Sequence, residues 1–162
     1  MTPQYQLFMN EIKKEGRYSR LYRQIEDLLK KSPDKQAAMA TIASVLYNKI
    51  DYFFWCGFYR LDGKKLIVGP YQGPPACQTL EGKGVCLAAV ERNSTVIVPD
   101  VHAFPGHIAC DSRSRSEIVI PVKNSEGQII GVLDVDSKDL ESFTEIDQKH
   151  LEQIVVLLQN IP

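Results

Sequence analysis

The chain has 162 residues, 44% of them hydrophobic, and it carries 19 basic and 20 acidic residues for a net charge of −1. A chain of this length can bury enough apolar surface to fold without a disulfide or a metal ion, so residues 1–162 are predicted to form a single domain. The balanced charge gives no reason to expect binding to nucleic acid or to an acidic membrane surface. Composition therefore favours a small molecule or another protein as the partner.

The N-terminal segment, Met1 to Gln6, lacks the basic start and apolar run of a secretory signal, and no window approaches the ~20 apolar residues of a membrane span. We therefore expect a cytoplasmic protein. Cysteines in a reducing compartment are more often catalytic, redox-active or buried than paired in structural disulfides. Their spacing here contains no C-x-x-C and no zinc-finger pattern, so no metal site and no other cofactor are expected. The four cysteines are Cys56, Cys77, Cys86 and Cys110.

Three helices are expected before residue 50. Thr2 and Pro3 form a typical helix start, and Gly16 is predicted to end the first helix. A second helix should follow and stop before Pro33, after which Asp34 should cap a third helix. The predicted helices cover residues 2–16, 19–32 and 34–49.

Strand patterns dominate the rest of the chain. Asp62-Gly63 and Asn124 to Gly127 both read as hairpin turns. Thr144 and Asp147 resemble a capping box that opens a terminal helix. Because consecutive strands joined by tight turns favour an antiparallel sheet, the predicted fold class is α+β with helices covering the sheet. Strands are expected at 52–61, 66–68, 95–98, 118–122 and 129–136, loops at 69–76 and 99–116, and a short helix at 85–92.

The loop at 99–116 is the first candidate for function. Loops longer than about 12–15 residues are uncommon in compact domains and are usually functional or disordered. Cys110 lies in it and is predicted to be a reactive thiol; Cys77 also lies in a loop. Cys86 stands in the first turn of a helix, where the dipole lowers a thiol pKa, so it could react or merely pack. His107 could assist Cys110 or be an ordinary loop histidine, whereas Cys56 is expected to be a buried hydrophobe.

Two groups of strand residues are further candidates. Trp55 and Tyr59 point to one face and flank Gly57, which predicts either a notch for a methyl, thioether or sulfoxide group or a plain aromatic core pair. Asp134 and Asp136 also share a face within an otherwise apolar strand.

Glu117 begins the neighbouring strand and could join these two aspartates. Buried carboxylates are costly unless they bind a cation or share a proton, so this cluster could hold an ammonium group or keep one carboxyl protonated. A strand end that reaches solvent is the structural alternative.

Several short segments share their residues and their order with one known family. The pairing of G-x-G-V-C with H-I-A-C-D is far more specific than the cysteine count. On these segments the chain resembles the free methionine-(R)-sulfoxide reductases, which are built on a single GAF-like domain. The matching segments are Trp55-Cys56-Gly57-Phe58-Tyr59, Gly82-Lys83-Gly84-Val85-Cys86, Asp100-Val101-His102, Gly106-His107-Ile108-Ala109-Cys110-Asp111, Ser116-Glu117-Ile118-Val119 and Gly131-Val132-Leu133-Asp134-Val135-Asp136-Ser137.

The resemblance implies a reaction and assigns roles. A thiolate, by position Cys110, would attack the sulfur of free L-methionine-(R)-sulfoxide and become a sulfenic acid. Cys77 would then condense with it into a disulfide that thioredoxin reduces. Cys86 also matches a family cysteine and stays open as the resolving or the attacking thiol. The implied substrate-binding residues are Trp55 and Tyr59 for the methyl end and Glu117, Asp134 and Asp136 for the sulfoxide and the ammonium.

Two alternatives from other classes stay open at this point. One is a GAF-like sensor that binds a small ligand without chemistry, since one fold hosts many functions. The other is a freestanding redox sensor in which Cys77 and Cys110 switch state without turnover. GAF-like domains also often pair through helices, so a homodimer through the N-terminal helices is possible.

Overall fold

A computed structural model describes residues 1–107 and 110–162. Its centre is a six-stranded antiparallel sheet in the order β3-β2-β1-β6-β5-β4. The strands are β1 (Trp55–Asp62), β2 (Lys65–Gln72), β3 (Thr79–Leu80), β4 (Val96–Val98), β5 (Ser116–Lys123) and β6 (Ile129–Ser137). The helices are α1 (Pro3–Leu29), α2 (Lys35–Lys49), α3 (Val85–Arg92) and α4 (Glu145–Val156), with 3₁₀ turns η1 (Val101–Ala103) and η2 (Leu157–Asn160).

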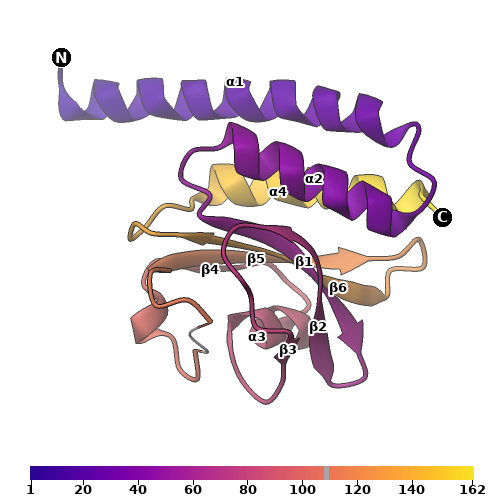
Figure 1. Cartoon of the computed structure of the whole chain (residues 1–162). Helices are drawn as coiled ribbons and strands as arrows, with labels where there is room; N and C mark the ends of the chain where they lie inside the picture. Colours follow the sequence, from indigo (N-terminus) through magenta and orange to yellow (C-terminus); the bar gives the residue numbers. More distant parts are fainter. Residues whose placement is uncertain (108–109) are drawn as a thin grey trace.

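The elements form layers on the two faces of the sheet (Figure 1). α2 and α4 cover one face, and α1 lies across them as an outer layer. α3 and the loops around it cover the opposite face. The α+β class and the antiparallel sheet flanked by N-terminal and C-terminal helices are therefore confirmed.

α1 is one continuous helix of 27 residues, so the prediction that Gly16 ends a first helix was wrong. A glycine inside a helix costs only about 1 kcal/mol relative to alanine. Side chains on both sides of Gly16, including Glu15 and Tyr18, contact α4, and these contacts offset that cost. Thr2 caps the start as predicted, with its hydroxyl accepting a hydrogen bond from the Tyr5 amide at 3.3 Å.

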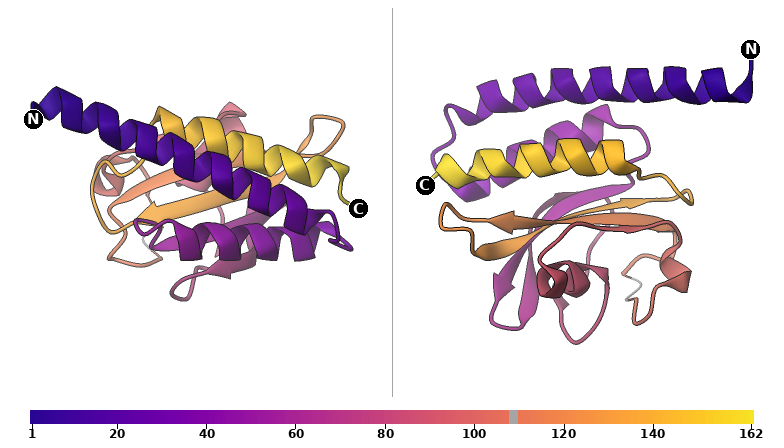
Figure 2. Two further views of the ribbon diagram at one scale, coloured as in Figure 1. Left: turned by 90° about the horizontal axis from the view of Figure 1, so that it is seen from above. Right: turned by 180° about the vertical axis from the view of Figure 1, so that it is seen from behind.

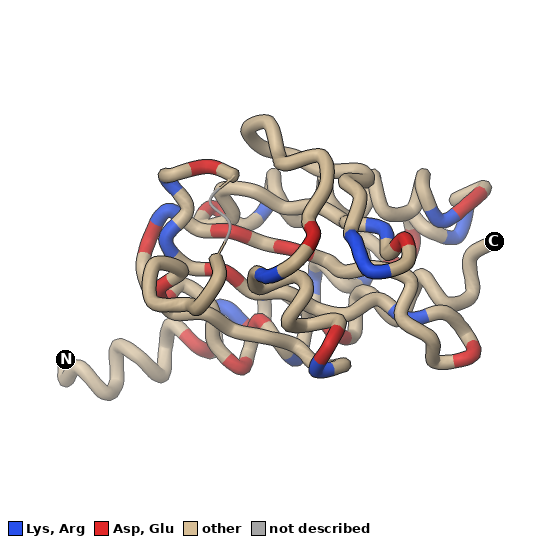
Figure 3. Tube along the Cα trace, turned by 90° about the horizontal axis from the view of Figure 1, so that it is seen from below, with Lys and Arg blue, Asp and Glu red and all other residues tan. Residues whose placement is uncertain are grey.

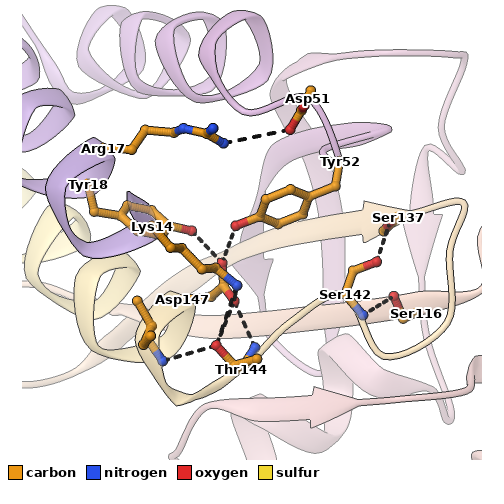
Figure 4. A network of polar contacts seen from close by, with 11 residues as sticks. Lys14, Arg17, Tyr18, Asp51, Tyr52, Ser116, Ser137, Ser142, Thr144 and Asp147 are labelled. Atoms are coloured by element: carbon orange, nitrogen blue, oxygen red, sulfur yellow. Dashed lines mark hydrogen bonds and ion pairs between the residues drawn. The ribbon is translucent and has the colours of Figure 1, made fainter. Parts of the chain in front are cut away.

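A buried polar network ties α1 to the rest of the domain (Figure 4). Asp147 at the start of α4 is fully buried and accepts hydrogen bonds from the hydroxyls of Tyr18 at 2.7 Å and Tyr52 at 2.6 Å. The ammonium of Lys14 pairs with the same carboxylate. Asp147 also accepts from the Thr144 amide at 2.7 Å, which completes the predicted capping box.

His150 on α4 is buried. Its ring stacks on Tyr18 with centroids 4.9 Å apart, and its Nε2 lies 2.5 Å from Oε2 of Glu15. His150 is buried because α1 packs over this part of α4. The sequence of α4 alone does not indicate that another helix packs there.

The locally encoded elements were predicted well. Asp34 caps α2, accepting a hydrogen bond from the Ala37 amide at 2.8 Å, and α3 has the predicted bounds. The loop predicted at 69–76 was too long, because β2 continues to Gln72 and pairs with β1 past an irregularity between Gly57 and Tyr59. Within 1–107 and 110–162, no helix combines the length and apolar character that crossing a membrane requires.

The sheet separates two apolar clusters. Cys56 and Phe58 point to the α2/α4 side, where Cys56 is fully buried as expected. Trp55 and Tyr59 point to the α3 side. The predicted alternation of β1 is therefore confirmed, and the candidate site lies on the α3 side.

Candidate active site

A pocket opens on the α3 side of the sheet. Its floor is formed by β1, β5 and β6. Its walls are formed by the start of α3, the loop after β2 and the side chains of His107, Cys110, Asp111 and Ser114. Viewed from this side, Lys and Arg positions are interspersed with Asp and Glu positions, so neither charge dominates the face (Figure 3). The predicted site residues that line the pocket are Trp55, Tyr59, Cys86, Cys110, Glu117, Asp134 and Asp136.

The remaining predicted residue, Cys77, is bonded to the pocket. Cys77 and Cys110 form a disulfide with Cα atoms 5.4 Å apart and a sequence separation of 33. Cys110 is exposed and Cys77 is half-buried. The structure thus pairs Cys110 with Cys77, while Cys86 is a free, buried thiol. Ile108 and Ala109, part of the H-I-A-C-D motif, lie outside the described residues.

The aromatic wall holds the loop that carries Cys77. The indole nitrogen of Trp55 donates to the Pro74 carbonyl at 3.1 Å, and the Tyr59 hydroxyl donates to the Cys77 carbonyl at 3.3 Å. The two rings are stacked with centroids 5.8 Å apart. Each side chain therefore positions backbone near the disulfide as well as lining the pocket.

The predicted notch at Gly57 does not exist. A Cβ placed there would lie 2.3 Å from Cβ of Tyr71 and 2.6 Å from the Trp55 ring. Gly57 is required because the Trp55 ring folds over it and stacks on Tyr71, with centroids 5.2 Å apart. Tyr71 was missed because it falls in the segment predicted as loop.

The three carboxylates meet as the strand geometry predicts. Glu117 on β5 is paired in register with Asp136 on β6, and Asp134 lies two residues before Asp136. Glu117 and Asp134 are buried, which excludes a solvent-reaching strand end as their explanation, whereas Asp136 is half-buried.

Burial is the main electrostatic influence on this cluster. It raises the pKa of Asp134 to about 6. It also raises the pKa of Glu117 well above its usual value, with repulsion from Asp134 and Asp136 adding to the effect. Asp136 is raised in pKa by burial and by Asp134. The raised pKa values favour the protonated carboxyls, which can donate as well as accept hydrogen bonds.

Cys86 does not have the lowered pKa expected from the helix dipole. Burial raises the pKa of its thiol, and the neighbouring carboxylates Asp134 and Glu117 raise it further. Its sulfur lies 3.9 Å from Oε1 of Glu117. Desolvation and like charge outweigh a dipole contribution of at most 1–2 kcal/mol. Cys86, Glu117 and Asp134 bring one ligand atom each to within 4.8 Å of one another, close enough to share a cation.

His107 lies at the mouth of the pocket. Its Nδ1 is 3.9 Å from Oε2 of Glu117, and partial burial lowers its pKa.

A cationic rim lies beyond His107. Arg113 donates two hydrogen bonds to the Asp111 carboxylate, at 2.7 Å and 2.9 Å, and they lower the pKa of Asp111 to about 2. Arg113 and Lys138 both lie over the Phe54 ring, at 4.9 Å and 4.6 Å. Arg113 is close to Cys110 in sequence, whereas Lys138 reaches this rim only through the fold.

The fold and the pocket define the class of protein. Residues 32–161 match the family described as GAF domain, so the chain belongs to the GAF domain family. It is 50% identical over 149 residues to "GAF domain-containing protein A" of Dictyostelium discoideum, covering 91% of this chain and 93% of that protein.

Two further relatives indicate which family of GAF-domain proteins the chain resembles. The "Free methionine-R-sulfoxide reductase" of Escherichia coli is 43% identical over 147 residues, covering 89% of this chain and 87% of that protein. The crystal structure of free methionine-R-sulfoxide reductase from Neisseria meningitidis in complex with its substrate superposes with a TM-score of 0.84 at 43% identity, covering 88% of this chain and 86% of that one. Within the GAF fold, the chain belongs to the free methionine-R-sulfoxide reductase family, a family of oxidoreductases.

Proposed function

We propose that this protein reduces free methionine-(R)-sulfoxide to methionine, with Cys110 as the nucleophile and Cys77 as the resolving thiol. The observation that carries the proposal is the Cys77–Cys110 disulfide at the mouth of a pocket lined by buried carboxylates and aromatic rings. Membership of the family supports the same reaction.

The proposed chemistry balances with two thiols. The Cys110 thiolate attacks the sulfoxide sulfur while a carboxyl protonates the oxygen, and the oxygen passes to Cys110 as a sulfenic acid, releasing methionine. The Cys77 thiol then attacks the sulfenic sulfur, forming the S–S bond and releasing the oxygen as water. One sulfoxide and two thiols thus yield one sulfide, one disulfide and one water.

The pocket contains a group for each part of the substrate. Trp55 and Tyr59 offer apolar surface to the methyl and thioether end. The carboxylate cluster offers a proton to the sulfoxide oxygen and a negative partner to the ammonium. At the start of α3, Gly84 provides no side chain to cap the first turn, so the free backbone amides can receive the substrate carboxylate. A methionine sulfoxide inside a peptide lacks both free ends, which supports a free amino acid as substrate.

Regeneration requires an external dithiol, and we propose thioredoxin. Thiol–disulfide exchange needs access to one sulfur, and Cys110 is exposed. A continuous supply of reduced thioredoxin favours the cytoplasm as the place of action.

We further propose that residues 1–162 act as one domain and associate as a homodimer through α1. The N-terminal half of α1 projects beyond α2 and α4 (Figure 2). On that half Leu7, Phe8 and Ile12 are 62%, 56% and 49% exposed. A second copy would cover these side chains.

Turnover by purified protein with a thioredoxin system tests the reaction. Free L-methionine-(R)-sulfoxide should be consumed, and Cys110→Ser should abolish the consumption. Cys77→Ser should stop multiple turnover but still allow one equivalent of methionine to form. Cys56→Ser is the matched control, because Cys56 lies on the opposite face of the sheet. Unchanged turnover in Cys110→Ser would refute the assignment, and ligand binding without turnover would favour a sensor.

A further inference from the structure

We propose that Cys86, Glu117 and Asp134 form a binding site for a thiophilic divalent cation, Zn²⁺, inside the pocket. When occupied, this site would block the sulfoxide. The cation site stands on the geometry of the pocket alone. The inhibitory consequence also rests on the proposed function.

The three side chains come from three separate elements and converge on one point. Cys86 lies in the first turn of α3, Glu117 on β5 and Asp134 on β6. All three are buried, and their ligand atoms lie within 4.8 Å of one another. Because the elements belong to one packed face, the donors are held together before any cation arrives.

One buried carboxylate oxygen at this point lacks a hydrogen-bond partner. Asp134 is 6% exposed, and its Oδ1 is the one buried side-chain oxygen or nitrogen without a hydrogen-bond partner among residues 1–107 and 110–162. An unpaired buried polar atom costs roughly 1–3 kcal/mol. Either a ligand of positive charge or a proton shared with Glu117 would remove that cost, and the metal titration below distinguishes the two.

The spacing suits a small tetrahedral ion. With Zn–S near 2.3 Å and Zn–O near 2.1 Å, tetrahedral donors lie about 3.5 Å apart. The Cys86 sulfur and Oε1 of Glu117 are already 3.9 Å apart. Because all three ligand atoms lie within 4.8 Å of one another, side-chain shifts of about 1 Å would bring them to this tetrahedral spacing.

The donor set selects among cations. Binding of a cation would release the protons of these groups, and the resulting thiolate and two carboxylates carry three negative charges, which a monovalent cation balances poorly. A thiolate favours Zn²⁺ over Mg²⁺ or Ca²⁺, which prefer oxygen ligands alone. A divalent, thiophilic ion is therefore the best match to these residues.

The site is independent of the Cys77–Cys110 disulfide, because Cys86 is free while that bond is formed. Binding can therefore be measured on oxidised protein, in which the proposed chemistry cannot proceed. Glu117 and Asp134 are also the carboxylates assigned to the substrate. Cation and sulfoxide should thus exclude each other.

Titration of oxidised, metal-free protein with Co²⁺ and with Zn²⁺ tests the site. We expect one ion per chain, a thiolate-to-cobalt charge-transfer band in the near ultraviolet, and displacement of Co²⁺ by Zn²⁺. Cys86→Ser should remove the band and weaken Zn²⁺ binding at least tenfold, and Glu117→Gln should weaken it as an independent variant. Cys56→Ser, the other free cysteine, should bind like the wild type. No stoichiometric binding, or binding unchanged in Cys86→Ser, would overturn the site.

Competition is tested without turnover in the double variant C77S/C110S, whose thiols are Cys56 and Cys86. Free methionine-(R)-sulfoxide should displace Co²⁺ and bleach the band. A band that persists although calorimetry shows the sulfoxide to be bound would overturn the competition. A sulfoxide that does not bind metal-free protein would instead count against the proposed function, leaving the metal titration to decide the site.

Discussion

Glu117 is the residue whose surroundings best fit proton donation. It is buried between the Cys86 sulfur at 3.9 Å and the His107 ring at 3.9 Å, and its pKa is raised by burial and by two neighbouring aspartates. A carboxyl with a raised pKa holds its proton more strongly than an ordinary carboxyl, and it can deliver that proton to the sulfoxide oxygen as the oxygen leaves.

Replacement of Glu117 by Gln should therefore lower kcat for sulfoxide reduction by at least about 10²-fold, the scale of general acid catalysis. The fold should survive, because Gln preserves the shape of the Glu117 side chain. Steady-state kinetics with a thermal melt checks both points. Glu141→Gln, at an exposed carboxylate, is the control; activity within a factor of three of wild type in Glu117→Gln would exclude Glu117 as the acid.

At the scale of elements, α1 is held by side chains distant in sequence rather than by its own propensity. Asp147 gathers Tyr18, Tyr52 and Lys14 at one buried carboxylate. Removing one partner from a buried polar cluster leaves the others unsatisfied, which costs more than an exposed pair is worth.

Asp147→Asn should lower the free energy of unfolding by roughly 3 kcal/mol, measured by urea denaturation. The matched control is Asp51→Asn, which removes an exposed partner 3.6 Å from Arg17 in the same region (Figure 4) and should cost under about 0.5 kcal/mol. Equal losses in the two variants would show that the buried network does not anchor α1.

Docking of α1 should also depend on pH through Glu15. Hydrogen bonds from His150 and Lys149 lower its pKa below 4.5 in the folded state. The stabilisation is therefore present above pH 4.5 and lost as the pH falls through the folded pKa. Hydrogen exchange of α1 amides should rise at pH 4 relative to α3, after correction for intrinsic rates. Glu15→Gln should reduce this pH difference and Glu11→Gln should not; an undiminished difference in Glu15→Gln would contradict the explanation.

Sequence reasoning succeeded where one short segment carries the information. The caps at Asp34 and Thr144 and the alternation of β1 and β6 are local, and they sufficed to place Trp55, Asp134 and Asp136 on the pocket face. The features that sequence reasoning missed depend on contacts between residues far apart in the chain. They are the continuity of α1 past Gly16, the burial of His150 and the raised pKa of Cys86.

At the scale of the whole molecule, α1 and α3 lie on opposite sides of the sheet (Figure 1), and the pocket is on the α3 side. On α1, the side chains of Leu7, Phe8 and Ile12 form an exposed apolar strip. Association through α1 would leave the pocket of each copy open. The proposed dimer contact and the proposed active site therefore lie on opposite faces of the domain.

Phe8→Asp with Ile12→Asp should convert a dimer into a monomer, measured by analytical ultracentrifugation. The charged side chains would be buried without partners at the proposed contact. Leu140→Asp, at an exposed leucine outside α1, should leave the dimer intact. A wild-type protein that stays monomeric at high concentration would contradict association through α1.

The account as a whole depends on which sulfurs are oxidised when methionine forms. Fully reduced protein should be given one equivalent of free methionine-(R)-sulfoxide, quenched by alkylation and analysed by peptide mass spectrometry. We predict one Cys77–Cys110 disulfide for each methionine produced, with Cys56 and Cys86 alkylated. A disulfide that contains Cys86, or methionine formed while Cys110 stays alkylated as a free thiol, would contradict the mechanism.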